Sequence, residues 1–583
     1  AADGLGGASF AGRGGSAVGG VARVQLDAGG SMLIGQDISV TANAIADIGG
    51  PAEQSGSASG GTASVALAAG LALPGNLVIA ADATYSERAP TAHVGGGAAT
   101  AGTATLQLLP GSVASANFIS ISAAGLGTVG AGGNAFTGGT ASLQVDDVGS
   151  TTSLAATTGL VISASALAAP GSINGNPDGG SATGGFAQII ASGNPKLNVS
   201  AGDVDVRADA VAGNGALGLG GTALGGRAHV NFQGGGSLQV PGQLGLSANA
   251  TAGSGTLGGN ATAFDAGSGA PPAVLLSYGG GATAADLGIA VGSAITLSAS
   301  ALGGTSDAGI GGAARGGLVV MSASSAGISA QAISLEASAD GGFGQAGGAA
   351  RSGRLITKLA DAGLSSQTDL AFNVNATGGT AFGGSGGRGG DATIGQISFT
   401  QSAKEGGPGS TTVILGNSIV SAEARGGDGD GATSGSAGNG GDAFGADPNA
   451  QLPAILIGVQ SAGTSFTTGL LAIDNMVFGG AGGVGSLAAN GGNGGKAVGG
   501  SVSIGAVDGA VIPVATRPFA NFGSLALIQA TVTGGAGGTV DGSGLGGRGG
   551  DASGGTGLLV SRGGVVIASA VIIDTSAQGG AAG

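Results

Sequence analysis

The sequence contains no cysteine, no tryptophan and only two histidines, and charged residues make up 8% of its 583 positions. Without cysteine the chain forms no disulfide, so redox chemistry indicates no particular compartment. The 17 Lys and Arg residues are outnumbered by 32 Asp and Glu residues, which gives a net charge of −15. Nucleic-acid binding requires clustered cations and anionic membranes repel such a chain, so we expect neither partner.

Long apolar runs are also missing. The run Ala63–Leu73 is interrupted by Gly70 and followed by Pro74-Gly75, so we expect no helix that inserts into a membrane. The chain opens on Ala1-Ala2-Asp3-Gly4, without a basic and apolar leader. Because both ends interrupt a repeated pattern, we expect the chain to be a segment of a longer protein.

Glycine is abundant, with 135 residues, but it follows no G-X-Y period and only 15 prolines accompany it, which excludes collagen. High glycine content often accompanies disorder. Here 42% of the residues are hydrophobic and the mean hydropathy is +0.40, whereas disordered chains have low hydrophobicity. We therefore expect a folded protein.

A repeated motif, GG-x-A followed by short apolar strands, covers the chain. Its copies lie roughly 36–55 residues apart and number about a dozen, a spacing typical of solenoids and other repeat arrays. We therefore predict one continuous repeat solenoid over residues 1–583. Clear copies begin at Gly60, Gly138, Gly220, Gly311, Gly389 and Gly549.

The segment Gly221–Ala250 illustrates one repeat. Val230 and Phe232 alternate with polar residues, which is the period-two pattern of a half-buried strand. Turns are indicated at Gly234–Gly236 and at Pro241-Gly242. Two further alternating runs follow these turns, and their apolar members are Leu238, Val240, Leu244, Leu246, Ala248 and Ala250. The repeat therefore reads as three strands and a glycine-rich return segment.

Stacked strands explain this pattern better than helices do. Glycine costs about 0.8–1.0 kcal/mol per residue in a helix interior relative to alanine, and no helical periodicity is present. We predict an all-β parallel β-helix, or β-solenoid, with the glycine-rich return segments on one side and their longest examples in residues 379–583. These segments form either mobile loops or, as we prefer, ordered polyproline-II-like strands.

Four aspartates are candidates for a weak calcium site. Gly386–Asp391 and Gly546–Asp551 partly match the G-G-x-G-x-D turn of calcium-binding nonapeptide repeats, which would make Asp391 and Asp551 ligands. Asp428 and Asp430 form a dense pair in a glycine-rich segment, and oxygen ligands on such a segment suit calcium. Ordinary turns and a solvated loop are the favoured interpretation, and we expect no other cofactor.

Little in the sequence points to catalysis. His93 and His229 lie in unrelated repeats, and strand alternation predicts that His229 faces solvent. The trio Asp203, Asp205 and Arg207 reads as a solvated strand face. We therefore expect no enzyme, although a polysaccharide-acting β-helix enzyme is the less favoured alternative because such enzymes use paired acids and aromatic platforms.

The unit GG-x-A-x-L-x-V…GG-S-L-x-V-x-G-x-L-x-L-S-A-x-A, read over Gly221–Ala250, resembles the repeats of large secreted Gram-negative adhesins, namely filamentous-haemagglutinin-like proteins and autotransporter passengers. The resemblance implies a right-handed parallel β-helix that is exported and displayed on the cell surface, anchored at the outer membrane through other parts of the protein. It implies a structural and adhesive role in attachment or biofilm, with cell-surface or matrix components as partners. A self-associating extracellular filament subunit that stacks end to end is the alternative.

Overall fold

The computed structural model describes residues 1–6, 14–30, 32–46, 56–85, 97–127, 134–147, 152–172, 176–199, 202–264, 271–279, 287–402, 411–447, 453–460, 464–507 and 518–583. These residues form strands and connecting segments, without a helix among them, as the sequence predicts. None of the described elements is therefore a helix long and apolar enough to cross a membrane.

The chain divides into two compact units. Unit 1 comprises Ala1–Gly253, Ala266–Ser298 and Val320–Ile333, and unit 2 comprises Ser254–Asp265, Ala299–Val319 and Ser334–Gly583. Each unit repeats the same coil, so the parallel β-solenoid predicted from the sequence is confirmed in both. A single continuous solenoid over residues 1–583 stays a prediction, as does the right-handed sense.

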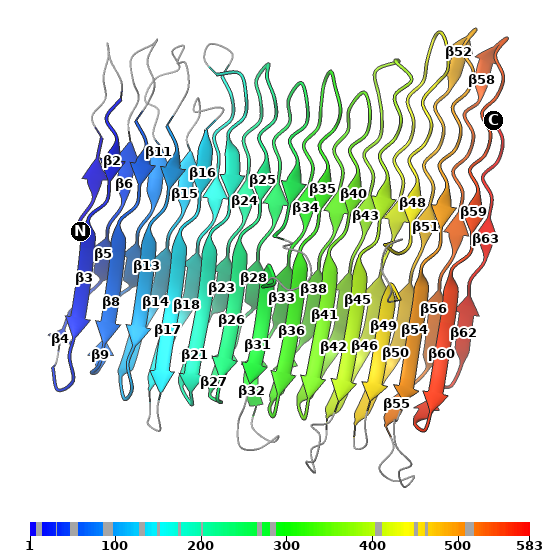
Figure 1. Ribbon diagram of the computed structural model, residues 1–583. Coiled ribbons are helices and arrows are strands. Elements are labelled where there is room, and N and C mark those ends of the chain that lie inside the picture. Colours follow the sequence, from blue (N-terminus) through cyan, green and yellow to red (C-terminus); the bar gives the residue numbers. More distant parts are fainter. Residues whose placement is uncertain are drawn as a thin grey trace. The chain divides into compact units, whose positions relative to one another are not determined.

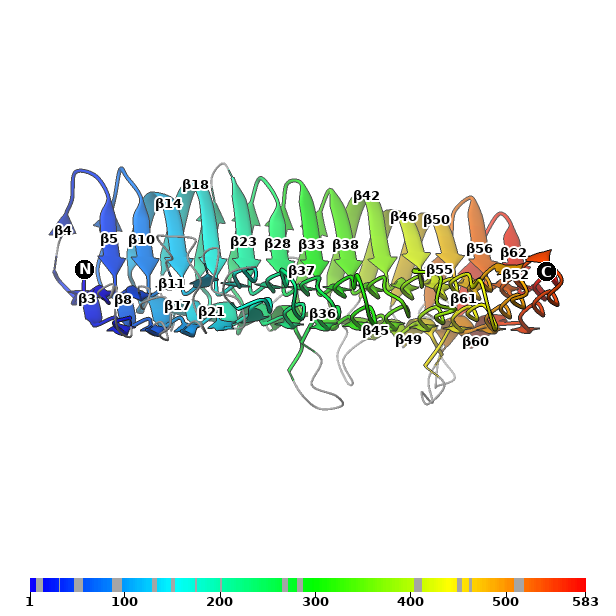
Figure 2. The same ribbon diagram turned by 90° about the horizontal axis from the view of Figure 1, so that it is seen from above.

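One coil passes through four parallel sheets, which we number I to IV. The chain runs along a strand of sheet I, turns into one or two strands of sheet II, and bends into a short strand of sheet III. It then leaves as a glycine-rich outgoing arm, reverses at a tip, comes back as a return arm, and enters a short strand of sheet IV before the next coil begins. Figure 1 shows the arms of neighbouring coils side by side within each unit, and Figure 2 shows sheets I and II on opposite faces.

The strands of unit 1 follow this order. Sheet I contains β3 (Val21–Leu26), β8 (Thr62–Leu67), β13 (Thr103–Leu108), β17 (Thr140–Asp147), β21 (Phe186–Gly193), β26 (Arg227–Gln233) and β31 (Val274–Gly279). Sheet II contains β4 (Met32–Leu33), β5 (Ile38–Thr41), β9 (Leu71–Ala72), β10 (Leu77–Ala80), β14 (Val113–Ser122), β18 (Ser153–Ser163), β22 (Lys196–Val199), β23 (Asp203–Arg207), β27 (Ser237–Val240), β28 (Leu244–Ser247), β32 (Leu287–Val291), β33 (Ala294–Ser298) and β37 (Gly327–Ala330). Sheet III contains β1 (Gly4–Leu5), β6 (Ala44–Ala46), β11 (Ala83–Tyr85), β15 (Gly125–Gly127), β19 (Ala166–Leu167), β24 (Ala210–Val211) and β29 (Ala250–Thr251). Sheet IV contains β2 (Ala17–Val18), β7 (Ala58–Ser59), β12 (Ala99–Thr100), β16 (Ala135–Thr137), β20 (Ser181–Thr183) and β25 (Ala223–Leu224).

Unit 2 has the same four sheets. Sheet I contains β41 (Arg354–Ala360), β45 (Gln396–Ser402), β49 (Ile455–Gln460), β54 (Ser501–Val507) and β60 (Thr556–Arg562). Sheet II contains β42 (Gly363–Asn373), β46 (Thr412–Ser421), β50 (Ser465–Asp474), β55 (Phe519–Asn521), β56 (Leu525–Gln529), β61 (Val565–Ile567) and β62 (Val571–Asp574). Sheet III contains β34 (Ala301–Leu302), β39 (Ala339–Asp340), β43 (Ala376–Thr377), β47 (Ala424–Arg425), β51 (Val477–Phe478), β57 (Val532–Thr533) and β63 (Ala577–Gln578). Sheet IV contains β30 (Ala261–Thr262), β35 (Ala314–Arg315), β40 (Ala350–Arg351), β44 (Ala392–Thr393), β48 (Ala443–Phe444), β53 (Ala497–Val498) and β59 (Ala552–Ser553). The short strands β52 (Gly485–Leu487) and β58 (Val540–Gly542) pair at the tips, and β36 (Leu318–Ser324) and β38 (Ala332–Glu336) contain residues of both units.

Side-chain alternation places the core as predicted. In sheet I of unit 1, equivalent residues of successive strands pair in register and form one fully buried apolar column, which contains Val65, Leu106, Leu143, Ile189, Val230 and Leu276. The predicted inward residues of the segment Gly221–Ala250 are all buried as well. Its third run bends at Ala248-Asn249, so that β28 belongs to sheet II and β29 to sheet III.

Sheets III and IV lie much closer together than packed sheets usually do. Packed sheets are about 10 Å apart, but here the glycines that link sheet IV to sheet I hydrogen-bond directly across the layer. Gly102 donates its N–H to the Ala81 carbonyl at 2.7 Å, and Gly139 donates to Ala123 at 2.8 Å. A Cβ on Gly125 of β15 would meet the Thr137 carbonyl oxygen of β16 at 2.5 Å, and a Cβ on Gly138 would meet the Ala164 carbonyl oxygen at 1.9 Å, so only glycine fits at these places.

The GG-x-A motif therefore marks two different places in the coil. The copies at Gly60 and Gly138 lead into β8 and β17 of sheet I, whereas those at Gly220, Gly389 and Gly549 lead from return arms into sheet IV. Both places need paired glycines because two backbones approach to hydrogen-bonding distance there.

The described glycine-rich arms of unit 2 are ordered, as the preferred interpretation of these segments predicts. In unit 2 an unbroken series of N–H···O=C bonds, each 2.7 to 3.0 Å long, links arm to arm, because each residue in the series donates to the one before it. This glycine ladder passes through Gly259, Gly304, Gly312, Gly342, Gly348, Gly379, Gly390, Gly427, Gly441, Gly480, Gly495, Gly535, Gly550 and Gly580.

The number of residues per coil varies, and some of the largest spacings lie near the end of the chain. Equivalent residues of neighbouring coils are 41 positions apart at Ser16 and Ser57, and 55 apart at Asn490 and Leu545.

Candidate functional site

The arms of unit 2 have a three-residue period, which sets the direction of every side chain on them. In the return arm 491–496, the N–H groups of Gly491 and Gly494 donate to Leu545 and Arg548 of the next coil, while those of Gly492 and Gly495 donate to the facing outgoing arm. Three residues per turn without internal hydrogen bonds is the geometry of polyproline II. The first two positions of each G-G-x triplet therefore point at other backbones, and the third position points to solvent.

Third-position residues of successive coils lie beside one another and form polar rows on the return arms. We call the first the acidic row, because three of its four members are aspartates: Asp391, Asp442, Lys496 and Asp551. The second, the amide row, contains Arg388, Asn439, Asn493 and Arg548. These rows include two of the four calcium candidates, Asp391 and Asp551.

Asn and Asp side chains in these rows accept hydrogen bonds from the backbone N–H groups of third-position residues in the next coil. The Asp391 Oδ1 atom accepts the N–H of Asp442 at 2.8 Å, and Asp442 Oδ1 accepts the N–H of Lys496 at 2.8 Å. Asn439 Oδ1 likewise accepts the N–H of Asn493 at 2.9 Å. Third-position N–H groups have no partner on the facing arm, so a short side-chain acceptor from the preceding coil stabilises the stack.

The carboxylates of Asp391 and Asp551 form ion pairs with arginines. Arg388 lies 2.6 Å from Asp391 Oδ1 and 3.1 Å from Asp442 Oδ2, and Arg548 lies 2.7 Å from Asp551 Oδ1. Among the described residues no group of three or more His, Cys, Asp or Glu side chains is arranged to hold a metal ion. Calcium binding at Asp391 or Asp551 therefore stays a prediction, and an ion would have to displace a guanidinium.

The structure separates Asp428 from Asp430, although the two are close in sequence. Asp428 occupies a third position, where its Oδ1 accepts the N–H of Ala481 at 2.8 Å. Asp430 is 9% exposed, and its Oδ2 accepts the N–H of Ser385 at 2.9 Å. Two residues of polyproline II correspond to two thirds of a turn, so these carboxylates point in different directions.

Related acceptor rows occur in unit 1, where they are more enclosed. Asn43 Oδ1 accepts the N–H of Asp82 at 2.8 Å, and Asp82 Oδ1 accepts the N–H of Ala124 and the hydroxyl of Ser122, both at 2.6 Å. Burial raises the pKa of Asp82, and these two hydrogen bonds offset part of that rise. Burial likewise raises the pKa of Asp209, which accepts from Asn249 and Ser247.

The prediction that His229 faces solvent is wrong. His229 is only 8% exposed, because the segment around Pro272 and the ring of Phe186 cover the outer face of β26. Its Nε2 lies 2.8 Å from the Pro272 carbonyl oxygen, and its ring meets that of Phe186 edge-on at 5.0 Å. Burial lowers the pKa of His229, and the nearby Arg227 lowers it further. The other histidine, His93, lies outside the described residues.

The trio Asp203, Asp205 and Arg207 behaves as predicted. Arg207 pairs with Asp205 at 2.6 Å on the outer surface of β23, and its side chain is 52% exposed. Asp203 Oδ1 accepts the N–H of Gln243 in the next coil at 2.7 Å. The trio is a solvated strand face with a structural acceptor at one end.

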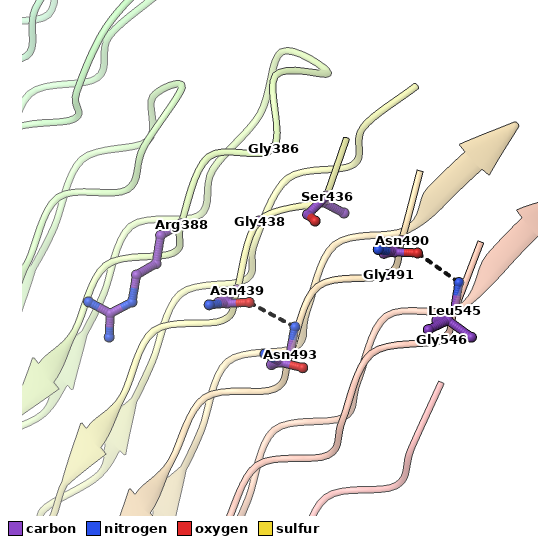
Figure 3. Close-up of a pocket in the computed structure, with 11 residues that line it drawn as sticks. Gly386, Arg388, Ser436, Gly438, Asn439, Asn490, Gly491, Asn493, Leu545 and Gly546 are labelled. Carbon is purple, nitrogen blue, oxygen red and sulfur yellow. Dashed lines mark hydrogen bonds between the residues drawn. The ribbon is translucent and has the colours of Figure 1, made fainter. Parts of the chain in front are cut away.

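The return arms also form a groove that the sequence analysis missed (Figure 3). One wall is part of the amide row and the other is a parallel row of Ser436, Asn490 and Leu545, and the floor between them is glycine and alanine. We call it the amide groove, and its volume is about 550 Å³. Its sequence signal is an asparagine that follows two small residues, at Asn439, Asn490 and Asn493, and this signal has meaning only once the stacking of third positions is known. The lining residues are Gly386, Arg388, Ser436, Ala437, Gly438, Asn439, Asn490, Gly491, Asn493, Leu545 and Gly546.

Comparison with protein-family models, curated proteins and solved structures found no match to this chain.

Proposed function

We propose that the chain is a structural and adhesive segment of an exported bacterial surface fibre, a stiff stalk that holds binding surfaces away from the cell. The observation that carries the proposal is the glycine ladder of unit 2, which joins every coil to the next in addition to the four sheets. Separating two coils requires breaking parallel ladders in several layers at once. Such redundancy suits a load-bearing element.

The composition places no redox requirement on the setting of the stalk. The stack contains no cysteine, so its integrity is independent of the redox state of its surroundings. Stability arises from neighbour-to-neighbour stacking, which extends without limit as coils are added. The resemblance to secreted adhesins gives this stack its proposed location and its proposed role in attachment and biofilm.

Pulling the chain between its ends by atomic force microscopy tests the mechanical part. A coil such as that between Asp442 and Lys496 spans 54 residues, so its release lengthens the chain by about 180–190 Å. We expect a sawtooth of such steps, shorter for the shorter coils of unit 1. Extension without steps, or release of a whole unit in one event at low force, contradicts the stalk.

Retention of coated beads under flow tests the adhesive part. Beads that carry the folded chain are expected to stay on bacterial or matrix-coated surfaces at shear that removes beads carrying the heat-unfolded chain. Equal retention of the two preparations contradicts an adhesive role.

A further inference from the structure

The amide groove presents hydrogen-bond donors and has few side-chain acceptors. Asn439 and Asn490 use their Oδ1 atoms to accept backbone N–H groups, from Asn493 at 2.9 Å and from Leu545 at 2.9 Å, and Figure 3 shows both bonds. Asn493 Oδ1 accepts from Arg548 at 3.0 Å. A backbone N–H can only donate, so the oxygen of each amide must face the backbone. The Nδ2 amino group is then the part of each amide that a ligand meets.

The groove is also electrically neutral. Among the described residues that line it, Arg388 carries the one charge, and its guanidinium is engaged by Asp391 and Asp442 of the acidic row. That neighbouring row contains three carboxylates and a single cation. Arg388 and Arg548 pair with these carboxylates, so the acidic and amide rows together carry no net charge and the groove favours a neutral ligand whose oxygens accept hydrogen bonds.

Leu545 adds an apolar side chain to the amide groove. Its side chain is 76% exposed and lies at one end of the row that contains Asn490. A ligand that places a methyl group beside Leu545 and a carbonyl oxygen beside the amides satisfies both features. An acetamido group, CH₃–CO–NH–, has these two parts and no charge.

The shape of the groove selects a linear chain of rings. Its residues come from four successive return arms, and neighbouring parallel strands repeat every 4.7–4.9 Å or so. The groove therefore runs along the stack, and its asparagine Nδ2 groups lie on the two middle arms, at Asn439, Asn490 and Asn493. Its floor of glycine and alanine offers no pockets for the alternating side chains by which extended peptides are recognised. A flat sugar ring needs no such pocket.

From these features we infer that the amide groove binds an oligosaccharide or polysaccharide bearing N-acetyl groups. The Nδ2 groups of Asn439, Asn490 and Asn493 donate to acetamido carbonyls or ring hydroxyls, and Leu545 contacts an acetamido methyl group. Binding is non-covalent and spans successive coils, so several weak contacts act together.

The test titrates the whole chain with a hexamer of N-acetylglucosamine and with the uncharged hexamer of glucose in the same linkage by calorimetry. We expect saturable binding of the acetylated hexamer and binding of the other at least tenfold weaker. An absence of saturable binding, equal affinity for the two hexamers, or tighter binding of an acidic oligosaccharide or of a glycine–serine peptide overturns the inference.

Conservative substitutions locate the site. Asn490→Asp keeps the Oδ1 acceptor for Leu545 and removes the donor, and Asp391 and Asp442 show that aspartate fits such a position. The loss of one donor to a bound carbonyl, together with a carboxylate facing it, is expected to weaken binding about tenfold or more. The matched control is Asn260→Asp, since Asn260 Oδ1 accepts the N–H of Ala313 at 2.8 Å in unit 2 but lies outside the groove.

Unchanged binding by the Asn490→Asp variant, or an equal loss in the Asn260→Asp control, overturns the inference. Leu545→Ser provides an independent variant, because this exposed side chain supports no buried contact and its backbone N–H remains. It is expected to weaken binding of the acetylated hexamer several-fold and to leave the thermal midpoint unchanged, and unaltered affinity contradicts the proposed methyl contact. These titrations do not depend on the force measurement, so the stalk and the glycan site can fail separately.

Discussion

Replacing one glycine of the ladder tests the arm geometry most directly. In Gly495→Ala the new Cβ would lie 1.9 Å from the Gly441 carbonyl oxygen and 2.6 Å from its carbon, both backbone atoms without room to move. The return arm must shift, and the bonds from Gly495 to Gly480 at 2.7 Å and from Gly535 to Gly495 at 3.0 Å are lost or distorted. Leaving a buried hydrogen-bonding group unsatisfied costs about 1–3 kcal/mol. For two bonds the local cost is therefore about 2–6 kcal/mol.

Hydrogen exchange read by mass spectrometry suits this local change. Peptides that cover 479–500 and 534–555 are expected to lose protection in the Gly495→Ala variant, whereas peptides of β45 and β49 keep it. The matched control is Gly458→Ala in β49 of the same unit, where the nearest neighbour of a new Cβ is the tip of Gln460 at 3.4 Å. That control is expected to be neutral or more stable by about 0.4–1 kcal/mol.

If the Gly495→Ala variant retained full protection in both arm peptides, or changed no more than Gly458→Ala, the close approach of the arms would be refuted.

Three further outcomes follow from the buried and paired titratable groups. Asp82→Asn should match or exceed the stability of the parent at neutral pH, because burial raises the pKa of Asp82 and the ionised carboxylate is disfavoured in the fold; its advantage should shrink on acidification as Asp82 becomes protonated. Asp82→Ala should instead cost about 1–3 kcal/mol in denaturant titrations, because the N–H of Ala124 loses its acceptor; equal stability of the two variants would contradict this role. Stability should fall as pH drops below about 6.5, since the unfolded state binds the His229 proton more tightly than the fold does, and His229→Gln should remove that part of the pH dependence; a melting profile with the same acid limb in both proteins argues against it. Chelation with EDTA should leave the thermal midpoint unchanged, because arginines already occupy Asp391 and Asp551; a clear drop would instead support the calcium hypothesis.

The failures of sequence reasoning share one physical cause, which is contact between residues far apart in the chain. His229 has outward parity on β26, but a segment more than forty residues later covers it through the Pro272 carbonyl. Asp428 and Asp430 are expected to lie close together if the segment that contains them is an irregular loop. In a polyproline-II arm the same spacing directs them to different partners, Ala481 and Ser385.

Local patterns in the amino-acid sequence were enough to predict the strands and the core. Period-two alternation is a local property of an extended backbone, so Val230, Phe232 and Leu238 already indicated which face is buried. Paired glycines in the sequence also mark the places where two backbones approach closely, because a Cβ there would collide with a carbonyl oxygen. The order of the described arms in unit 2 becomes evident only in three dimensions, since polyproline II has no hydrogen bonds of its own and depends on acceptors in other coils. The amide groove depends on the same stacking, because Asn439 and Asn493 are 54 residues apart in the chain and adjacent in space.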